Sequence, residues 1–315
     1  VTRTAYLELL FENEGALKQL IHLCQASPWV ADYIAKYPIL LDELIDPELQ
    51  HRPVKLSEYA LELHESMLRI PEEDLEAQMD SLRLFKQAQQ LRIAAADIGN
   101  ILDVKQVSKH LTALARAIVN EVINLAWKQI TSRFGVPESL LNAAEIDAVN
   151  KGFGVIAYGK MGGEELGYGS DLDLVFVHHS KADEVTTGLA VNHTELSTQP
   201  NPLRQTPPVM KSIPASQFYM KLAQRIMHIF NTRMGSGILY ELDMRLRPSG
   251  NSGLLVVHID TYAKYQQEEA WTWEHQALVR AKMIFGNASI NKDFVSLRNK
   301  VLTRKREDDQ LKQDV

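Results

Sequence analysis

The sequence predicts an α+β protein in which a helical region precedes a strand-containing core. From residue 4 to about residue 147, apolar side chains recur at helical spacing. Over Gly154–Val177 the pattern becomes an apolar run, a glycine-rich turn and a second apolar run, GVIAYGKMGGEELGYGSDLDLVFV, which indicates strand, turn and strand. We therefore expect a helical domain at 1–150, a core domain at 151–285 and the start of a further helical region at 286–315.

Within the helical region, short helices are separated by Pro28, Pro38, Pro53 and Pro71. A longer pattern starts at Glu72, where RLFKQAQQLRIAAADI is rich in strong helix formers. The next periodic run predicts a helix over Val104–Phe134, ended by the breaker Gly135-Val136-Pro137.

The part of the chain that follows the second strand is less regular. Residues 183–214 show little periodicity and predict a flexible insertion, although an ordered segment that faces a substrate is the alternative. Ala215–Thr232 predicts an amphipathic helix. Ile238–Arg247 alternates apolar and charged residues and predicts a half-buried strand, and Gly253–Val257 predicts another. Thr261–Phe285 predicts one or two helices.

Composition restricts the class of protein. The hydrophobic fraction of 45% and the charged fraction of 23% are typical of a soluble globular protein. The net charge of −6 argues against a general nucleic-acid binder. Cys24 is the only cysteine, which favours a reducing compartment such as the cytoplasm. No apolar run reaches the roughly 18 residues of a membrane span, and the first residues lack a signal-peptide pattern. Because the chain starts without methionine and stops in a charged helical pattern, we expect a fragment.

The most informative residues are acidic. Asp171 and Asp173 are two apart at the start of a predicted strand, so their carboxylates project to the same side. Asp243 lies on a later predicted strand, and an adjacent position in the sheet would bring it beside the pair. Carboxylates gathered in this way suit Mg²⁺, and two such ions can assist phosphoryl displacement. Arg245 and Arg247 would then be placed to bind phosphate oxygens. A structural ion-pair ladder is the alternative.

Two other motifs are weaker. Residues 154–160 match G-x-x-x-x-G-K, but Met161 stands where a P-loop needs Ser or Thr, and VIAY resembles the interior of a strand. We therefore do not expect a P-loop. His178, His179 and His193 lack the spacing typical of metal ligands.

Longer segments point to a family. YGKMGGEELGYGSDLDLVFVH, LYELDMRLRPSGNSGLLV and EAWTWEHQALVRAKMIFG resemble the glutamine synthetase adenylyltransferases, members of the nucleotidyltransferase superfamily that includes DNA polymerase β. The superfamily pattern is an h-G-[GS] turn, an Asp-h-[Asp/Glu]-h pair about ten residues later and a distal carboxylate. Tyr158-Gly159-Lys160 matches the turn, with Lys160 where serine is usual. RTAYLELLFENEGALKQLIHLC, SPWVADYIAKYPILLDELID and FKQAQQLRIAAADI resemble the helical region before the family's catalytic core.

The resemblance implies a DNA polymerase β-like core, a mixed sheet flanked by helices, and assigns roles to residues. Asp171, Asp173 and Asp243 would be catalytic and would bind two Mg²⁺ ions. The residues implied to bind ATP, the substrate nucleotide, are Gly159, Lys160, Gly162, Gly163, Ser170, Arg245 and Arg247.

The resemblance also implies partners. Glutamine synthetase would be the protein substrate, and the PII signal protein and glutamine would be regulators. The family carries two related units, one that attaches AMP to a tyrosine and one that removes it. The segments GYGSDLDLVF, ILYELDMRLRPSG and AWTWEHQALVRA look more like the C-terminal, AMP-attaching unit. Removal of AMP by phosphate, or a non-catalytic regulatory module that binds nucleotide or glutamine, are the alternatives. Trp271 and Trp273 are expected to pack in a core or a domain interface.

Overall fold

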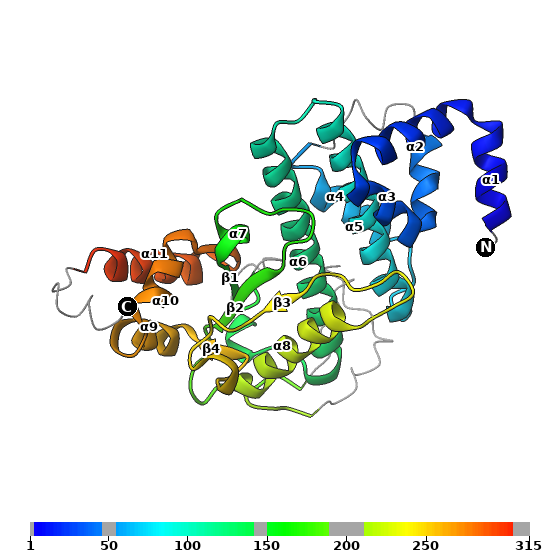
Figure 1. Ribbon diagram of the computed structural model, residues 1–315. Coiled ribbons are helices and arrows are strands. Elements are labelled where there is room, and N and C mark those ends of the chain that lie inside the picture. Colours follow the sequence, from blue (N-terminus) through cyan, green and yellow to red (C-terminus); the bar gives the residue numbers. More distant parts are fainter. Residues whose placement is uncertain (1–2, 46–54, 142–149, 189–210, 305–315) are drawn as a thin grey trace, which may run out of the picture. The chain divides into compact units, whose positions relative to one another are not determined.

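The computed structural model describes residues 3–45, 55–141, 150–188 and 211–304 (Figure 1). The described residues group into two compact units. The first contains the chain up to Glu121 together with Glu164–Ser170 and Asn231–Leu239, and the second contains the remainder. Each unit therefore combines segments that are far apart in the sequence.

The first unit is helical, as the sequence predicted. Side-chain oxygens of Asn13, Ser27 and Asp74 accept hydrogen bonds from backbone N–H groups at the starts of α2, α3 and α5, which satisfies donors that a helix leaves free. The core includes Leu23, Val30 and Leu91. The helices are α1 Arg3–Glu12, α2 Glu14–Ala26, α3 Pro28–Lys36, the 3₁₀ helix η1 Pro38–Ile45, α4 Tyr59–Met67, α5 Leu75–Ile98 and α6 Val104–Phe134, which ends in the second unit.

The second unit is built on a mixed five-stranded sheet, and this confirms the α+β prediction. Four strands follow the order β3-β2-β1-β5, and β4 also pairs with β2. β1 is antiparallel to β2 and β5, whereas β2 is parallel to β3 and β4. The strands are β1 Phe153–Ala157, β2 Leu172–His178, β3 Leu242–Asp243, β4 Val256–His258 and β5 Lys282–Phe285. The predicted strand, turn and strand over Gly154–Val177 is confirmed.

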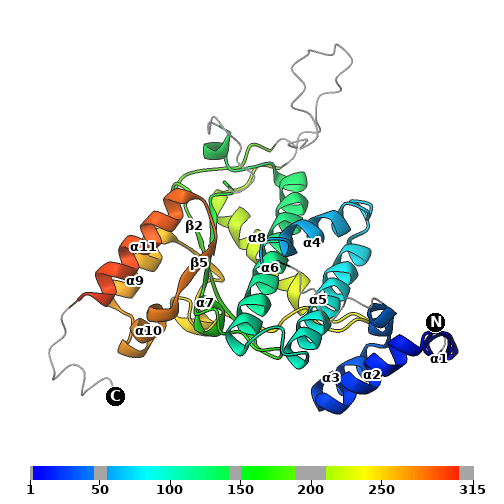
Figure 2. The same ribbon diagram turned by 90° about the horizontal axis from the view of Figure 1, so that it is seen from above.

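Helices cover both faces of this sheet (Figure 2). On one face, β1, β2 and β5 pack against α9 and α11 through buried side chains such as Ile156, Tyr262 and Phe294. On the other face, Tyr219 of α8 stacks on Phe153 with ring centroids 6.3 Å apart. The remaining helices are α7 Gly159–Gly162, α8 Ala215–Asn231, α9 Ile259–Glu268, α10 Thr272–Ala277 and α11 Ala288–Leu302, with the 3₁₀ helices η2 Glu138–Leu140, η3 Gly250–Ser252 and η4 Leu278–Arg280.

Several predicted elements differ in the structure. The ten-residue strand predicted over Ile238–Arg247 was wrong, because only Leu242–Asp243 forms a strand and turns occupy the next residues. Lys282–Phe285, predicted as helical, is instead strand β5, because its apolar side chains complete the sheet beside β1. The strand predicted at Gly253–Val257 starts later, at Val256. The helices predicted at Val104–Phe134 and Ala215–Thr232 are confirmed, the second ending one residue earlier.

The predicted insertion at 183–214 is described only at its two ends, since residues 189–210 lie outside the described ranges. Val185 pairs with Pro214 in an isolated bridge, and the Thr186 N–H donates to the Ile213 carbonyl at 2.9 Å. The two described ends of the segment therefore lie side by side in the second unit. None of the helices in the described part of the chain is long and apolar enough to cross a membrane.

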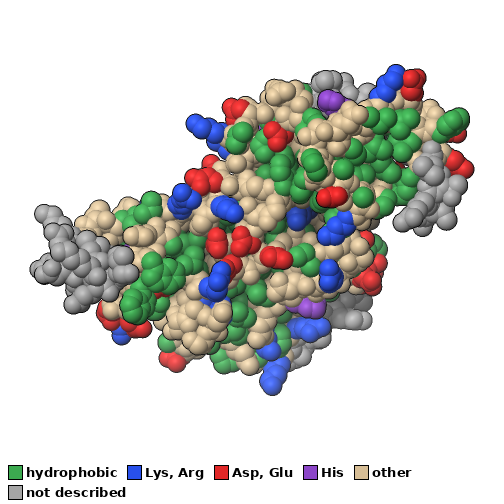
Figure 3. All heavy atoms as spheres, in the orientation of Figure 1, with side chains coloured by type: hydrophobic (Ala, Val, Ile, Leu, Met, Phe, Trp, Pro, Cys, Tyr) green, Lys and Arg blue, Asp and Glu red, His purple; other side chains and the backbone are tan. Residues whose placement is uncertain are grey.

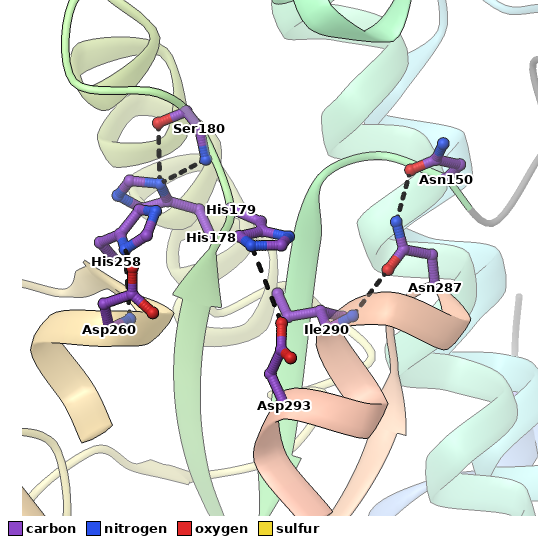
Figure 4. Close-up of polar contacts among 9 residues, drawn as sticks. All are labelled: Asn150, His178, His179, Ser180, His258, Asp260, Asn287, Ile290 and Asp293. Atoms are coloured by element: carbon purple, nitrogen blue, oxygen red, sulfur yellow. Dashed lines mark hydrogen bonds and ion pairs between the residues drawn. The ribbon is translucent and has the colours of Figure 1, made fainter. Parts of the chain in front are cut away.

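The last residue of β2, His178, lies in a cluster of imidazoles (Figure 4). His178 is opposite His258 in the β2–β4 pair, and its ring stacks on Tyr219 with centroids 4.9 Å apart. The Ser180 hydroxyl lies 3.0 Å from His178 Nδ1. His178 is buried, and this burial, with a smaller effect of the neighbouring His258, lowers its pKa to about 4. His178 is therefore neutral in the folded protein at neutral pH.

This lowered pKa predicts a pH-dependent stability. Between about pH 6.5 and pH 4 the unfolded chain protonates His178 whereas the folded protein does not, so stability is lost as the pH falls through this window. We expect His178→Gln to remove about 2 to 3 kcal/mol of the loss between pH 7 and pH 4.5, measured by urea unfolding. His179→Gln, at the neighbouring exposed histidine, is the control and should keep most of the loss, because the charge of His179 has only a minor effect on the pKa of His178. An equal pH dependence in wild type and His178→Gln would contradict this explanation.

Candidate metal and nucleotide site

The sheet brings the three predicted carboxylates together. β2 and β3 are parallel, and their register places Asp173 directly opposite Asp243. Asp171 precedes Asp173 by two residues, at the start of β2. One carboxylate oxygen from each of the three residues lies within 4.8 Å of the others, and no other such group of His, Cys, Asp or Glu occurs among the described residues. The structure therefore supports the geometric prediction made from the Asp-x-Asp spacing.

The charges in this cluster are unevenly balanced. Asp173 is partly buried, and this burial, together with the negative charges of Asp171 and Asp243, raises its pKa. The opposite holds for Asp243, whose pKa is lowered chiefly by hydrogen bonds from the Arg245 side chain. When Asp173 is ionised, it therefore lies beside two other negative charges, and no cationic side chain of the described residues is hydrogen-bonded to it. A bound divalent ion would relieve this repulsion.

The glycine turn lies against the same carboxylates. β1 ends at Ala157, and the Tyr158 N–H donates to the Asp173 carbonyl at 2.9 Å. Gly159 then opens the single helical turn α7 with φ of +53°. A Cβ at Gly159 would lie 2.2 Å from Asp173 Oδ2, so only glycine permits this approach and this backbone conformation together. The residues that match the P-loop pattern, Gly154–Ala157, are in β1 and do not form a phosphate loop.

The other predicted nucleotide-binding residues near the turn have different environments. Lys160 is exposed, and its charge opposes the rise in the pKa of Asp173. Gly163 ends α7, where its N–H donates to the Gly159 carbonyl at 3.1 Å. The Ser170 hydroxyl accepts from the Gly167 N–H at 3.0 Å, which closes a turn just before Asp171. Gly162 packs against the backbone of Arg280. Their roles in binding ATP stay predictions.

The two predicted arginines behave differently. Arg245 is largely exposed, and its Nε donates to both Asp243 oxygens at 3.0 and 2.8 Å. Arg247 is buried and donates to the backbone carbonyls of Met244 and Asn251 at 2.8 and 3.2 Å. Arg247 therefore holds the turn after β3, and Arg245 is the more exposed cation beside the carboxylates.

An open pocket of about 430 Å³ lies in the second unit at these residues. It is lined by Asp171, Asp243, Arg245, Arg247 and six further residues that were not predicted as site residues: Met227, Glu241, Leu242, Met244, Asn251 and Leu255. Acidic side chains with basic ones beside them are visible over the region of α7 and β2 (Figure 3). An all-oxygen ligand set of this kind is typical of Mg²⁺ or Mn²⁺.

The tryptophan cluster is not part of a core. Trp271 and Trp273 are 60% and 54% exposed, so they do not pack in a core of the described chain, and the other expected place, a domain interface, stays a prediction. The buried residues of this segment are Thr272, Glu274 and His275. Glu274 accepts from the Trp271 N–H at 2.8 Å and from the Tyr265 hydroxyl at 2.9 Å, which fixes the start of α10 against α9. Helical spacing alone did not show which face of this short helix is buried.

Comparisons with known proteins agree with the family resemblance seen in the sequence motifs. Residues 17–201 and 196–296 match the family model for glutamate-ammonia ligase adenylyltransferase. The whole chain is 51% identical to the bifunctional glutamine synthetase adenylyltransferase/adenylyl-removing enzyme of Shewanella loihica and covers 31% of it. The chain belongs to the glutamate-ammonia ligase adenylyltransferase family, and it spans about a third of the length of this curated relative. The resemblance read from the motifs is confirmed.

Proposed function

We propose that this chain transfers AMP from ATP to a tyrosine hydroxyl of glutamine synthetase and releases pyrophosphate. The observation that carries the proposal is the group of three carboxylates, Asp171, Asp173 and Asp243, beside a glycine turn. Membership of the family and the name of the Shewanella loihica relative support glutamine synthetase as the substrate. Glutamine and the PII signal protein are proposed as regulators from the same resemblance.

The donor set fits Mg²⁺. All three side chains offer carboxylate oxygens, which are the ligands that hard divalent cations prefer. Asp171 and Asp173 would hold two ions, and Asp243 would contribute to the catalytic one. Bound there, Mg²⁺ would lower the pKa of the attacking hydroxyl, which is about 10 for free tyrosine, and neutralise charge on the phosphates.

The residues of the chain itself would orient the nucleotide. Arg245 is exposed, and its side chain can leave Asp243 for a phosphate oxygen when a cation takes its place at that carboxylate. Lys160 would meet the phosphates as a point charge. Gly159 leaves room for this approach because it has no side chain between the turn and Asp173. Arg247 would act mainly by fixing the turn that carries Arg245.

The reverse activity is the second candidate. The relative's name includes an adenylyl-removing enzyme, and this chain covers only part of that protein. Phosphate-driven removal of AMP would use the same carboxylates and release ADP. The likeness of GYGSDLDLVF and ILYELDMRLRPSG to the AMP-attaching unit favours transfer.

The test is an assay with ATP labelled at the α-phosphate, Mg²⁺ and unmodified glutamine synthetase. We expect label on the synthetase, and no label when the synthetase is omitted or EDTA is added. The same preparation is then given AMP-modified synthetase and phosphate. Release of ADP without any forward transfer would mean that the reverse activity is the correct one. Mg²⁺-dependent ATP binding without either reaction would instead support a regulatory module.

A further inference from the structure

The pocket of about 430 Å³ lies on one side of the three carboxylates. Asp171 and Asp243 are in its wall, and all of its other lining residues come from α8 or from residues 241–255, which include β3 and the turns after it. Neither Gly159 nor Lys160 of the glycine turn lines it. All of these residues belong to the second unit, so the position of the pocket beside the carboxylates is a property of that unit alone.

The strand order places the glycine turn and the pocket on opposite sides of the carboxylates. In the path β3-β2-β1-β5, β2 lies between β3 and β1. Gly159 follows β1 and approaches Asp173 from that side, since a Cβ at Gly159 would lie 2.2 Å from Asp173 Oδ2. Asp243 pairs with Asp173 from the other side, on β3. The carboxylates therefore lie between the glycine turn and the pocket.

The walls of the pocket offer apolar surface. Four of its lining residues are apolar, namely Met227, Leu242, Met244 and Leu255. Met227, Leu242 and Leu255 are only partly buried, so part of their apolar surface is available to a bound group. Apolar walls with a few polar groups are typical of binding pockets, and a volume at the lower end of their range suits a single aromatic side chain.

The charges of the pocket do not favour a polyphosphate. Glu241, Asp171 and Asp243 are acidic, and only two arginines stand against them. The side chain of Arg247 donates to backbone carbonyls, and that of Arg245 pairs with Asp243. A polyanion in this pocket would therefore meet carboxylates of the same charge, whereas a neutral phenol, with an apolar ring and one hydroxyl, would not.

We propose that this pocket binds the tyrosine side chain that receives AMP. Displacement at phosphorus places the attacking and the leaving oxygens roughly in line, on opposite sides of the phosphorus atom. With the triphosphate at Gly159 and Lys160, pyrophosphate leaves on the side of β1, so the attacking hydroxyl enters from the side of β3. This inference rests on the proposed function, since that function supplies both ATP and the tyrosine.

The pocket gives the transfer a defined course. The tyrosine oxygen forms a bond to the α-phosphorus while the bond from that phosphorus to the α,β-bridging oxygen breaks, and pyrophosphate leaves with the electron pair. The phenolic proton passes to water at the open mouth of the pocket. Met227, Leu242 and Leu255 contact the ring and determine specificity, because a serine or threonine side chain would leave their apolar surface in water.

Two variants that fill the pocket test this assignment, each with a matched control. Leu255→Trp and Met227→Trp place an indole in the pocket from the residue before β4 and from α8. Leu254 is 62% exposed, Gln224 is an exposed residue of α8, and neither lines the pocket. Leu254→Trp and Gln224→Trp therefore add the same side chain outside it. A thermal melt checks each variant, and one that is not folded at the assay temperature is replaced by phenylalanine at the same position.

Two measurements separate the acceptor from the nucleotide. The first is kcat/KM for glutamine synthetase in AMP transfer, with saturating ATP labelled at the α-phosphate. The second is the Kd of labelled ATP in the presence of Mg²⁺, obtained by equilibrium dialysis without the synthetase. We expect both filled variants to lower kcat/KM by about a hundredfold, the effect of displacing a reacting group, and to change the Kd of ATP by less than about twofold. The two controls should leave both quantities within about twofold of wild type.

The other outcomes overturn the proposal in ways that can be told apart. Weaker ATP binding in both filled variants, but in neither control, would show that the pocket holds the nucleotide. Transfer at the wild-type rate by a folded, filled variant would show that the tyrosine enters elsewhere. In both cases the transfer by wild type leaves the proposed function standing. If wild type transfers no AMP, the proposed function is refuted, and the acceptor role of the pocket with it.

Discussion

Asp173→Asn is expected to lower AMP transfer by about a thousandfold or more and to leave the fold at least as stable as that of wild type. Loss of an outer-sphere partner of a metal typically costs 10- to 100-fold, and a carboxylate that binds the metal directly should cost more. Asp173 is central in the cluster, since its pKa is raised by burial and by both other carboxylates. Asparagine removes the charge and keeps the shape of the side chain.

The expected effect on stability follows from the same shift. Because the pKa of Asp173 is raised in the folded protein, the unfolded chain releases this proton first, and stability falls as the pH rises from about 4 through the folded pKa. The free-energy cost of keeping Asp173 ionised in the folded protein then persists at neutral pH. We therefore expect Asp173→Asn to melt at the same temperature as wild type or higher in the absence of Mg²⁺. Added Mg²⁺ should raise the melting temperature of wild type only.

Asp293→Asn is the control, because Asp293 is a partly exposed aspartate of α11 that pairs with His179. It should retain transfer and the stabilisation by Mg²⁺. Transfer by Asp173→Asn at more than about a tenth of the wild-type rate would refute the role of Asp173 as a metal ligand. Unfolding of Asp173→Asn would instead show that this carboxylate is needed for the fold.

The part of the site that could be predicted from sequence depends on local rules. Asp171 and Asp173 were recognisable because the period of a strand places residues two apart on one side. Asp243 could be added because apolar residues flank it and a neighbouring strand would bring it within reach. The structure shows that even a two-residue strand is sufficient for this pairing. The helical region was predictable for the same reason, since its periodicity is long and regular.

The parts that were missed depend on contacts between distant residues. The alternation around Arg247 did not show that its side chain donates to three backbone carbonyls, those of Met244, Asn251 and Gly253. Its binding of phosphate stays a prediction. Lys282–Phe285 is too short to show the alternation of apolar and polar side chains that is typical of a strand. Its backbone forms a strand because it pairs with β1. No local pattern connects Gln87 with Ser236, which is 149 residues away in the sequence. Such partners are fixed by the tertiary fold.

Gly162→Ala is expected to destabilise the protein by about 3 kcal/mol or more. The sequence assigned Gly162 to nucleotide binding, but the structure gives it a packing role as well. A Cβ there would lie 2.0 Å from the Arg280 carbonyl oxygen and 2.6 Å from that of Ala157. Both are backbone atoms that cannot turn away, so α7 would have to move from β1 and from the residues before β5, at the cost typical of overpacking and backbone strain.

Gly169→Ala is the matched control, because a Cβ at Gly169 meets no atom within 4 Å and its φ is not left-handed. Its stability should lie within about 0.5 kcal/mol of wild type. Urea unfolding measures both variants, and ATP binding is measured at urea-free conditions where each remains folded. If Gly162→Ala is as stable as Gly169→Ala but has lost ATP binding, then contact with the nucleotide explains this glycine. If Gly162→Ala is less stable by the expected amount, then Gly162 is needed for the close packing of α7. This packing would hold the turn that carries Gly159 beside Asp173.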